Sequence, residues 1–317
     1  MANLTADTVT APGSGTDPGA RRFQSWLRTG PKPVRVLARY AGLIPFAAYL
    51  ALFLIVPLIA IIIGAFQNPQ TNAFTWFNVN TAVHGVYLHG FEQSLILSLI
   101  ASVIPGIFGL LIAYAIFTAR GRGGSSLRQV VITASGVFAN FGGVPLAFLF
   151  IASVGSSALI TGWLHAIGLN IYNWGFSLYD LSGVAVVYMY FQIPLMVLII
   201  LPALEGLRPA WREAAENMGA RSWQYWRYVG GPVLFPTFMS CLMLLFGSAL
   251  AAYATAEALT SGTIPLTSIQ IGTFLNGNVL AGQENVGKAL SLGMVVIIAV
   301  LMTFYILFQR RAAKWLR

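Results

Sequence analysis

Long, uninterrupted apolar runs dominate the sequence and are separated by shorter polar segments. Six of these runs hold about 20 residues or more, the length that a helix needs to cross the ~30 Å hydrocarbon core of a membrane. The runs are continuous rather than alternating, so they predict helices, which satisfy their own backbone polar groups in lipid. The pattern predicts an all-α membrane protein with transmembrane helices at residues 42–66, 93–118, 130–153, 183–203, 234–257 and 289–308.

The composition agrees with a protein that crosses the membrane several times. Of the 317 residues, 57% are hydrophobic and 9% are charged, whereas soluble domains carry roughly 25% charged residues. The first apolar run begins at residue 42 and no small-residue cleavage site stands out after it. We therefore interpret it as a membrane helix and not as a cleavable signal peptide.

Basic residues gather on one side of the predicted membrane. Six precede the first span, three lie between spans two and three, four between spans four and five, and four after span six. These are 17 of the 18 Lys and Arg residues, and only Lys288 lies on the opposite side. Because basic loops stay in the cytoplasm, the pattern predicts a multi-pass protein of the cell membrane with both termini cytoplasmic. The net charge of +9 then reflects topology, and we expect no nucleic-acid partner.

The chain before the first span predicts two kinds of segment. Residues 1–20 are rich in Ala, Gly, Thr and Pro without apolar periodicity, which is typical of a disordered tail. Residues 21–41 mix basic and apolar side chains, which suits an amphipathic segment on the inner membrane surface, with a solvated basic linker as the alternative. We expect residues 42–317 to form one six-span domain.

The polar segment between spans four and five, about residues 205–232, predicts a short helix, a tight turn and a second helix. Pro209 suits the first turn of a helix, where its missing N–H costs nothing. Gly219 suits a left-handed helix cap. Ser222 can cap the second helix, and Pro232 marks the entry into span five.

Polar side chains inside predicted spans are candidates for a solute path, because such groups are costly in lipid and usually face a cavity or a partner helix. The candidates are Asn140, Tyr188, Tyr190, Gln192, Tyr253, Thr255 and Glu257. For each, a structural hydrogen bond between helices is the alternative. Pro145 and Pro194 are expected to break their helices and to free polar backbone groups near the path. A carboxylate at Glu257 would favour a cationic or amine solute.

Two other kinds of site are not expected. His84 and His89 are five residues apart with only Glu92 nearby, a poor fit to one helical face, so we expect no metal site. The segment Gly282–Ala289 has the Gly-x4-Gly-Lys spacing of a phosphate-binding loop. The Ser or Thr that would bind Mg²⁺ is replaced by Ala289, and no strand precedes the segment. We expect this chain to bind no cofactor and to hydrolyse no ATP. The single cysteine, Cys241, forms no intrachain disulfide.

The polar segment also carries a motif. Glu213-Ala214-Ala215 is followed after three residues by Gly219 and after nine more by Val229-Gly230-Gly231-Pro232. This resembles the EAA loop of the transmembrane permease subunits of type I (MetI-like) ABC importers, in which Ile-x-Leu-Pro takes the last four places. Val229 stands for Ile and Gly231 stands for Leu. The resemblance covers about residues 42–317.

Two further runs narrow the resemblance. Residues 140–148 and 251–260 are similar to spans three and five of permeases for spermidine and putrescine, thiamine, ferric iron or phosphonates. Polyamine permeases of this group carry an acidic residue near the position of Ala252 and Tyr253. This chain has none there, which argues against a polyamine.

The resemblance implies a permease that takes up a small polar solute and is not itself an enzyme. It implies a cytoplasmic ABC ATPase dimer that binds ATP and Mg²⁺, a second permease subunit, identical or similar, and an extracytoplasmic solute-binding protein. It assigns ATPase coupling to Glu213, Ala214, Ala215, Gly219 and Arg221. The main alternative is a gradient-driven secondary transporter or channel. That alternative explains six spans but not the EAA loop, and neither inverted repeats nor buried ion pairs stand out.

Overall fold

The computed structural model of the chain describes residues 43–119, 124–169, 171–277 and 282–314. The tail and basic segment expected at residues 1–41 lie outside these ranges. The chain divides after Ala60 into two compact units, and each unit is described by itself.

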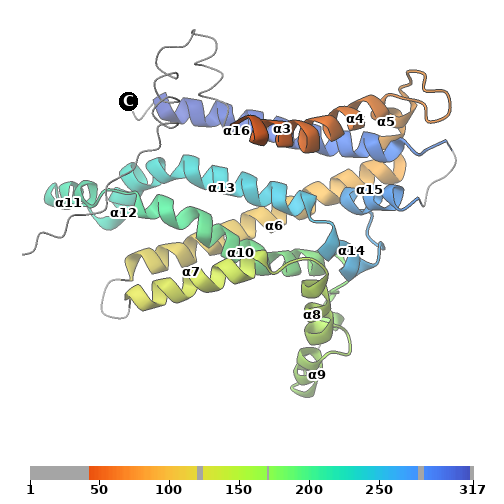
Figure 1. Ribbon diagram of the computed structural model, residues 1–317. Helices are drawn as coiled ribbons and strands as arrows, with labels where there is room; N and C mark the ends of the chain where they lie inside the picture. Colours follow the sequence, from red (N-terminus) through yellow and green to blue (C-terminus); the bar gives the residue numbers. More distant parts are fainter. Residues whose placement is uncertain (1–42, 120–123, 170, 278–281, 315–317) are drawn as a thin grey trace, which may run out of the picture. The chain divides into compact units, whose positions relative to one another are not determined.

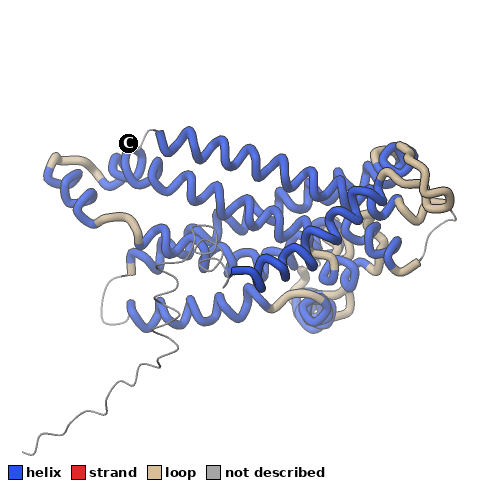
Figure 2. Tube along the Cα trace, turned by 45° about the horizontal axis from the view of Figure 1, so that its top comes forward, coloured by secondary structure: helices blue, strands red, loops and turns tan. Residues whose placement is uncertain are grey.

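The described residues are helical, and Figure 2 shows helices joined by loops with no strand among them. The prediction of an all-α protein is confirmed. In chain order the α-helices are α3 (Ile44–Leu50), α4 (Val56–Ala65), α5 (Phe77–Ala82), α6 (Gly85–Thr118), α7 (Gly124–Asn140), α8 (Val144–Val154), α9 (Leu159–Ala166), α10 (Leu181–Glu205), α11 (Pro209–Asn217), α12 (Ser222–Tyr225), α13 (Gly231–Ala251), α14 (Ala254–Thr260), α15 (Thr267–Leu275) and α16 (Val286–Lys314). Two π-helical turns, η2 (Ala51–Ile55) and η4 (Trp226–Gly230), and one 3-10 turn, η3 (Ile171–Trp174), lie between them.

Six described segments are long and apolar enough to cross a membrane, as expected from the sequence. They are Ile44–Ala65, Gly85–Thr118, Val144–Ala166, Leu181–Glu205, Ser222–Ala251 and Val286–Leu307. Their number matches the prediction, and four of them contain or nearly match a predicted span. The third and fifth differ from the predicted helices in a way that matters for the site.

The predicted third span, residues 130–153, is wrong as a single helix. α7 ends at Asn140 and α8 begins at Val144, after a turn in which Gly143 has φ +76°. Pro145 lies in the first turn of α8, where its missing N–H breaks no helical hydrogen bond. It therefore starts a new helix instead of kinking an existing one.

α7 is the helix of this region that packs within the bundle. Its 17 residues extend about 25 Å and pack along α10, whereas α8 turns away from that pair (Figure 1). α8 and α9 together have the length and apolar character of a span, but they are two separate helices of 11 and 8 residues. Neither reaches across a ~30 Å core alone. We call Val144–Ala166 the α8–α9 arm.

α10 is the central helix of the unit that follows Ala60. It packs against α6, α7 and α13 (Figure 1), and it buries Tyr188, Met196, Ile200 and Leu204 completely. The expectation that Pro194 breaks this helix is wrong, because α10 runs unbroken through it. Helices packed on several sides of a membrane helix allow it to tolerate a proline.

The predicted fifth span, residues 234–257, is wrong at its C-terminal end. α13 begins at Gly231 with Pro232 in its first turn, as predicted, and it continues a helical run that starts at Ser222 and includes η4. It stops at Ala251, where Ala252 adopts an extended conformation. The short helix α14 then starts at Ala254.

Short helices and loops close the end of the bundle opposite α11. Asn78 in α5 donates from Nδ2 to the carbonyls of Ala65 (3.2 Å) and Gln67 (2.9 Å), and Asn285 donates from Nδ2 to Gln67 O (2.7 Å). The last carbonyls of a helix lack partners in their own helix. These two amides therefore fasten the end of α4 to the start of α16.

Candidate functional site

The segment from Pro209 to Gly230 is built by local signals, and we call it the coupling segment. Pro209 is the first residue of α11, and the preceding Arg208 is extended (φ −68°, ψ 126°). Gly219 has φ +77°, and its N–H donates to Glu216 O at 2.9 Å, while Ala220 N–H donates to Ala215 O at 3.0 Å. The predicted helix and left-handed cap are confirmed.

The surface of α11 is polar and exposed, with one exception. Glu213 and Ala214 are exposed, whereas Ala215 is buried within the chain at 6% exposure. Of the two alanines, only Ala214 therefore offers a small side chain to a partner. Arg212 Nε donates to Glu216 Oε1 at 2.9 Å, and this hydrogen bond raises the pKa of Arg212 above its ordinary value.

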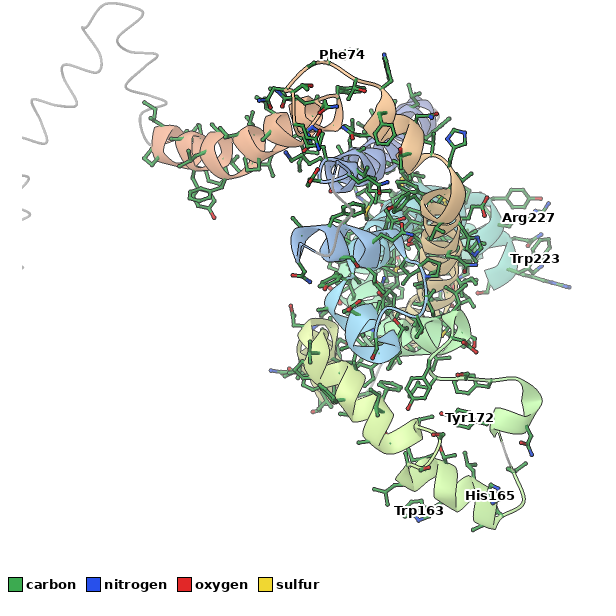
Figure 3. The ribbon with its side chains drawn as sticks, turned by 90° about the vertical axis from the view of Figure 1, so that its right-hand side faces the viewer. Phe74, Trp163, His165, Tyr172, Trp223 and Arg227 are labelled. Atoms are coloured by element: carbon green, nitrogen blue, oxygen red, sulfur yellow. The ribbon has the colours of Figure 1, made fainter. Side chains whose placement is uncertain are left out.

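Exposed aromatic and apolar side chains surround this charged face. The guanidinium of Arg208 lies 5.8 Å from the centroid of the Trp211 ring, and Met218 is 81% exposed. Figure 3 shows Trp223 and Arg227 projecting away from the bundle. An exposed mixture of aromatic, apolar and charged side chains is typical of a protein-binding surface.

The second helix of the segment begins differently from the prediction. Ser222 is the first helical residue and not the cap, because Arg221 takes the cap position. The backbone N–H of Arg221 donates to Gln224 Oε1 at 2.7 Å. At Gly231 a Cβ atom would lie 2.4 Å from Trp226 O, so the Leu of the EAA pattern would not fit beside this π-helical turn.

One ion pair near the coupling segment was not anticipated. Arg128 of α7 donates to Glu205 Oε1 at the end of α10, from Nε at 2.8 Å and from Nη2 at 2.6 Å. The two side chains are 47% and 39% exposed. Arg128 and Glu205 lie beside apolar runs that are far apart in the sequence. The sequence predicts that both residues lie on the same side of the membrane, but it does not predict that they are in contact.

The second feature of the site is a pair of helix breaks that meet. The gap between α7 and α8 lies beside the gap between α13 and α14, because Gly143 N–H donates to Thr255 Oγ1 at 2.8 Å. Tyr188 of α10 donates from its hydroxyl to Ala252 O at 2.6 Å. The backbone groups freed by the two breaks therefore find partners in buried side chains, as a membrane interior requires. We call these two gaps the paired breaks.

The other path candidates divide into three groups. Gln192 is fully buried, and its Nε2 donates to Leu245 O at 2.8 Å while its Oε1 has no hydrogen-bond partner in the described residues. Tyr190 packs against the rings of Phe138, Phe141 and Phe150.

The third group of path candidates consists of Asn140, Tyr253 and Glu257. Asn140 donates from Nδ2 to Gly136 O within its own helix. Tyr253 lies against Gly272, where a Cβ atom would meet its ring at 2.5 Å. Glu257 is half-buried, and its Oε2 is enclosed without a hydrogen-bond partner among the described residues.

Two serines of α6, Ser94 and Ser98, lie beside the paired breaks. A space of about 160 Å³ lies between Ser94, Ser98, Tyr188, Ala252 and Ser268, and it is too narrow to hold a water molecule. Ser94 Oγ accepts from Thr267 N–H at 2.8 Å. The two serines were missed by the sequence reasoning, because small hydroxyls inside an apolar run are common and carry no distinct signal.

Comparisons with known proteins agree with this architecture. The chain is 24% identical over 274 residues to the thiamine transport system permease ThiP of Salmonella typhimurium, covering 86% of this chain and 45% of that protein. It is 28% identical over 206 residues to the sulfate transport system permease CysT of Escherichia coli, covering 65% and 69%. A ferric transport system permease, FbpB of Actinobacillus pleuropneumoniae, is 24% identical over 258 residues, covering 81% and 36%. No protein-family model matches the chain.

Solved structures show the same fold. A bacterial ABC transporter for import of the acidic polysaccharide alginate superposes with a TM-score of 0.71 at 20% identity, over 92% of this chain and 99% of that one. The MetNI methionine ABC transporter superposes with a TM-score of 0.54 at 14% identity, over 73% and 97%. In sequence and in fold, the chain is similar to permease subunits of ABC importers.

This similarity does not fix the role of any residue. The chain spans less than half of the length of the thiamine permease and about a third of that of the ferric permease. The coupling roles of Glu213, Ala214, Ala215, Gly219 and Arg221 remain predictions for this permease, as does the solute path.

Proposed function

We propose that this permease carries a small polar solute into the cytoplasm, driven by a separate ATPase. An external binding protein delivers the solute, a second permease subunit completes the path, and an ATPase dimer on the cytoplasmic side binds ATP and Mg²⁺. The named relatives support the transport role, and the structure of the alginate transporter in complex with a periplasmic protein supports the partners. The basic residues support an orientation with the coupling segment and both termini in the cytoplasm.

The observation that carries this proposal is a continuous helix between the two features of the site. From Ser222 to Ala251 the chain is helical without interruption. One end of this helix is joined to α11 through the turn at Gly219, and the other end stops at Ala252, where Tyr188 holds the paired breaks. A displacement of α11 by an ATPase would therefore pass along one continuous helix to the paired breaks.

Such a displacement favours transport only if the two states bind their ligands unequally. In the structure, Gly143 and Ala252 are each held by one side-chain hydrogen bond. Each bond contributes about 1 kcal/mol. ATP binding by the partner can supply that much and can open the path at the breaks.

The solute is a small polar molecule whose charge is open. The relatives are named for thiamine, sulfate and ferric iron, and these solutes differ in charge. Phosphonates and polyamines complete the group that the motifs indicate, and the missing acidic residue near Ala252 and Tyr253 argues against polyamines. If the solute is a cation that contacts Glu257, Glu257→Gln will weaken its apparent affinity for uptake. An unchanged affinity would show that this carboxylate does not contact the solute.

The decisive experiment is affinity purification of the full chain from native membranes in mild detergent, followed by mass spectrometry and an ATPase assay. We expect a cytoplasmic ATPase to co-purify with a second permease or a binding protein, and its ATP hydrolysis to respond to the loaded binding protein. A chain recovered alone, or only with copies of itself, would contradict the proposal and favour a gradient-driven transporter.

A further inference from the structure

We propose that the α8–α9 arm is an outer-surface membrane anchor. In this arrangement α9 lies at the boundary between lipid headgroups and acyl chains and inserts Leu159, Trp163 and Ile167 into the lipid. The assignment of the arm to the outer side of the membrane rests on the orientation given in the proposed function. The assignment of lipid as its partner rests on the residues of the arm alone.

The first observation is an apolar stripe along α9 and its C-cap residue, Ile167. Leu159, Trp163 and Ile167 follow one another at intervals of four residues, which places them on one face of a helix. They are 70%, 72% and 71% exposed. In Figure 3 the Trp163 side chain projects from the opposite side of α9 to His165. Exposed Trp and aliphatic side chains on one face of a short helix are typical of a segment at the membrane interface.

The second observation is that the arm holds this stripe in a fixed direction. Thr161 Oγ1 donates to Val154 O at 3.0 Å, and the hydroxyl of Tyr172 donates to the same carbonyl at 2.9 Å. These bonds satisfy the last carbonyl of α8 and pin α9 and the chain after it to the end of α8. Thr161 lies on the side of α9 opposite to the stripe. The stripe therefore faces away from α8.

The third observation is the absence of charge. The sequence contains no Asp, Glu, Lys or Arg between Arg128 and Asp180. A segment of this length in water, or at the rim of a protein interface, normally carries charged side chains. Trp163, Tyr172, Trp174 and Tyr179 follow within the same stretch, and Trp and Tyr are enriched where a membrane meets water.

Exposed apolar residues are not confined to α9. Phe148 and Leu149 of α8, which belongs to the same arm, and Val186 of α10 are exposed as well. The arm begins at Gly143, which is hydrogen-bonded to Thr255. A lipid-bound arm would therefore hold one side of the paired breaks at a fixed depth in the membrane.

Site-directed spin labelling tests this inference. The chain has one cysteine, Cys241, so a Cys241→Ala background receives a single label at Trp163→Cys, at Ile167→Cys, or at His165→Cys as the matched control on the opposite face. The labelled complex is reconstituted into vesicles of phosphatidylethanolamine and phosphatidylglycerol. Power-saturation EPR then compares accessibility to oxygen, which concentrates in lipid, and to a water-soluble nickel chelate.

We expect oxygen accessibility to exceed nickel accessibility at positions 163 and 167, and the reverse at position 165. Greater nickel accessibility at 163 and 167 would place the stripe in water and overturn the inference. Low accessibility to both reagents there would mean that protein covers the stripe, for example the second permease or the binding protein, and would overturn it as well. ATP hydrolysis by the same labelled complex reports separately on the proposed function.

Discussion

The coupling segment and the paired breaks are held by hydrogen bonds of different range. In the coupling segment the bonds join residues three to five apart, such as Gly219 N–H to Glu216 O and Arg221 N–H to Gln224 Oε1. At the paired breaks they join residues 112 and 64 positions apart, in the pairs Gly143–Thr255 and Tyr188–Ala252. A change in the first region is therefore expected to act on a partner, whereas a change in the second acts on the fold.

The largest effect on transport is expected from Gly219→Asp. The residue has φ +77°, and a Cβ atom added to it would have no neighbour within 4 Å, so the replacement meets no internal clash. It adds strain of about 1 kcal/mol and a negative charge to the surface where the ATPase is expected to dock. We expect ATP-driven uptake to be lost, while membrane insertion, measured by fractionation and protease protection, is unchanged.

Gly219→Asn is the matched control, because Asn tolerates the left-handed conformation and carries no charge. We expect it to retain most of the uptake. Wild-type uptake by the Asp variant would remove Gly219 from the coupling assignment.

The next largest effect, now on stability, is expected from Thr255→Val. It keeps the shape of the side chain but leaves the buried Gly143 N–H without its acceptor, which costs about 1–3 kcal/mol. The buried Cys241 gives a direct readout, because a thiol-reactive dye reports unfolding in a thermal ramp. We expect a lower melting temperature.

Thr260→Val provides the comparison within the same helix. Its hydroxyl is also buried but donates to Ala256 O one turn earlier, so its loss leaves no backbone N–H unpaired. Equal melting temperatures for the two variants would mean that the Gly143–Thr255 bond does not stabilise the paired breaks.

A smaller effect is expected from Tyr188→Phe. The ring remains in the core, and the variant loses the hydroxyl that donates to Ala252 O. A net loss of about 1 kcal/mol should lower the melting temperature and loosen the paired breaks. Tyr190→Phe keeps the three ring contacts of its neighbours and is the control. A larger loss in Tyr190→Phe than in Tyr188→Phe would contradict the role given to the Tyr188 hydroxyl.

The smallest effect is expected at the Arg128–Glu205 pair near the coupling segment. Both side chains are more than a third exposed, so solvent and salt screen the pair and its coupling is expected to be below about 1 kcal/mol. A double-mutant cycle of Arg128→Gln and Glu205→Gln, read by melting temperature at low and high salt, measures it. A coupling energy that stays the same at high salt would show that the Arg128–Glu205 pair is not screened by solvent, and would contradict this prediction.

The same contrast explains how much can be predicted from the sequence. Pro209, Gly219 and the apolar runs act through neighbours in the chain, so the helix, its cap and the number of spans are predictable. The break after Asn140 and the end of α13 at Ala251 depend on Thr255 and Tyr188, which approach only in the folded bundle. Pro145 and Pro194 look alike in sequence, yet one begins a helix and the other lies within one.

The π-helical turn η4 fixes the rotational phase between the docking surface and the membrane helix. An α-helix turns by about 100° per residue, because 3.6 residues complete one turn, and a π turn accommodates one residue more than an α turn. Within Trp226–Gly230, the loss of a single residue would convert the π turn to regular α-helix and swing α11 around the axis of α13. The rotational position of the face proposed to meet the ATPase, relative to the paired breaks, is thus set by one residue. Homologous permeases that exchange ATPases are therefore expected to share this π-helical turn as well as the surface residues.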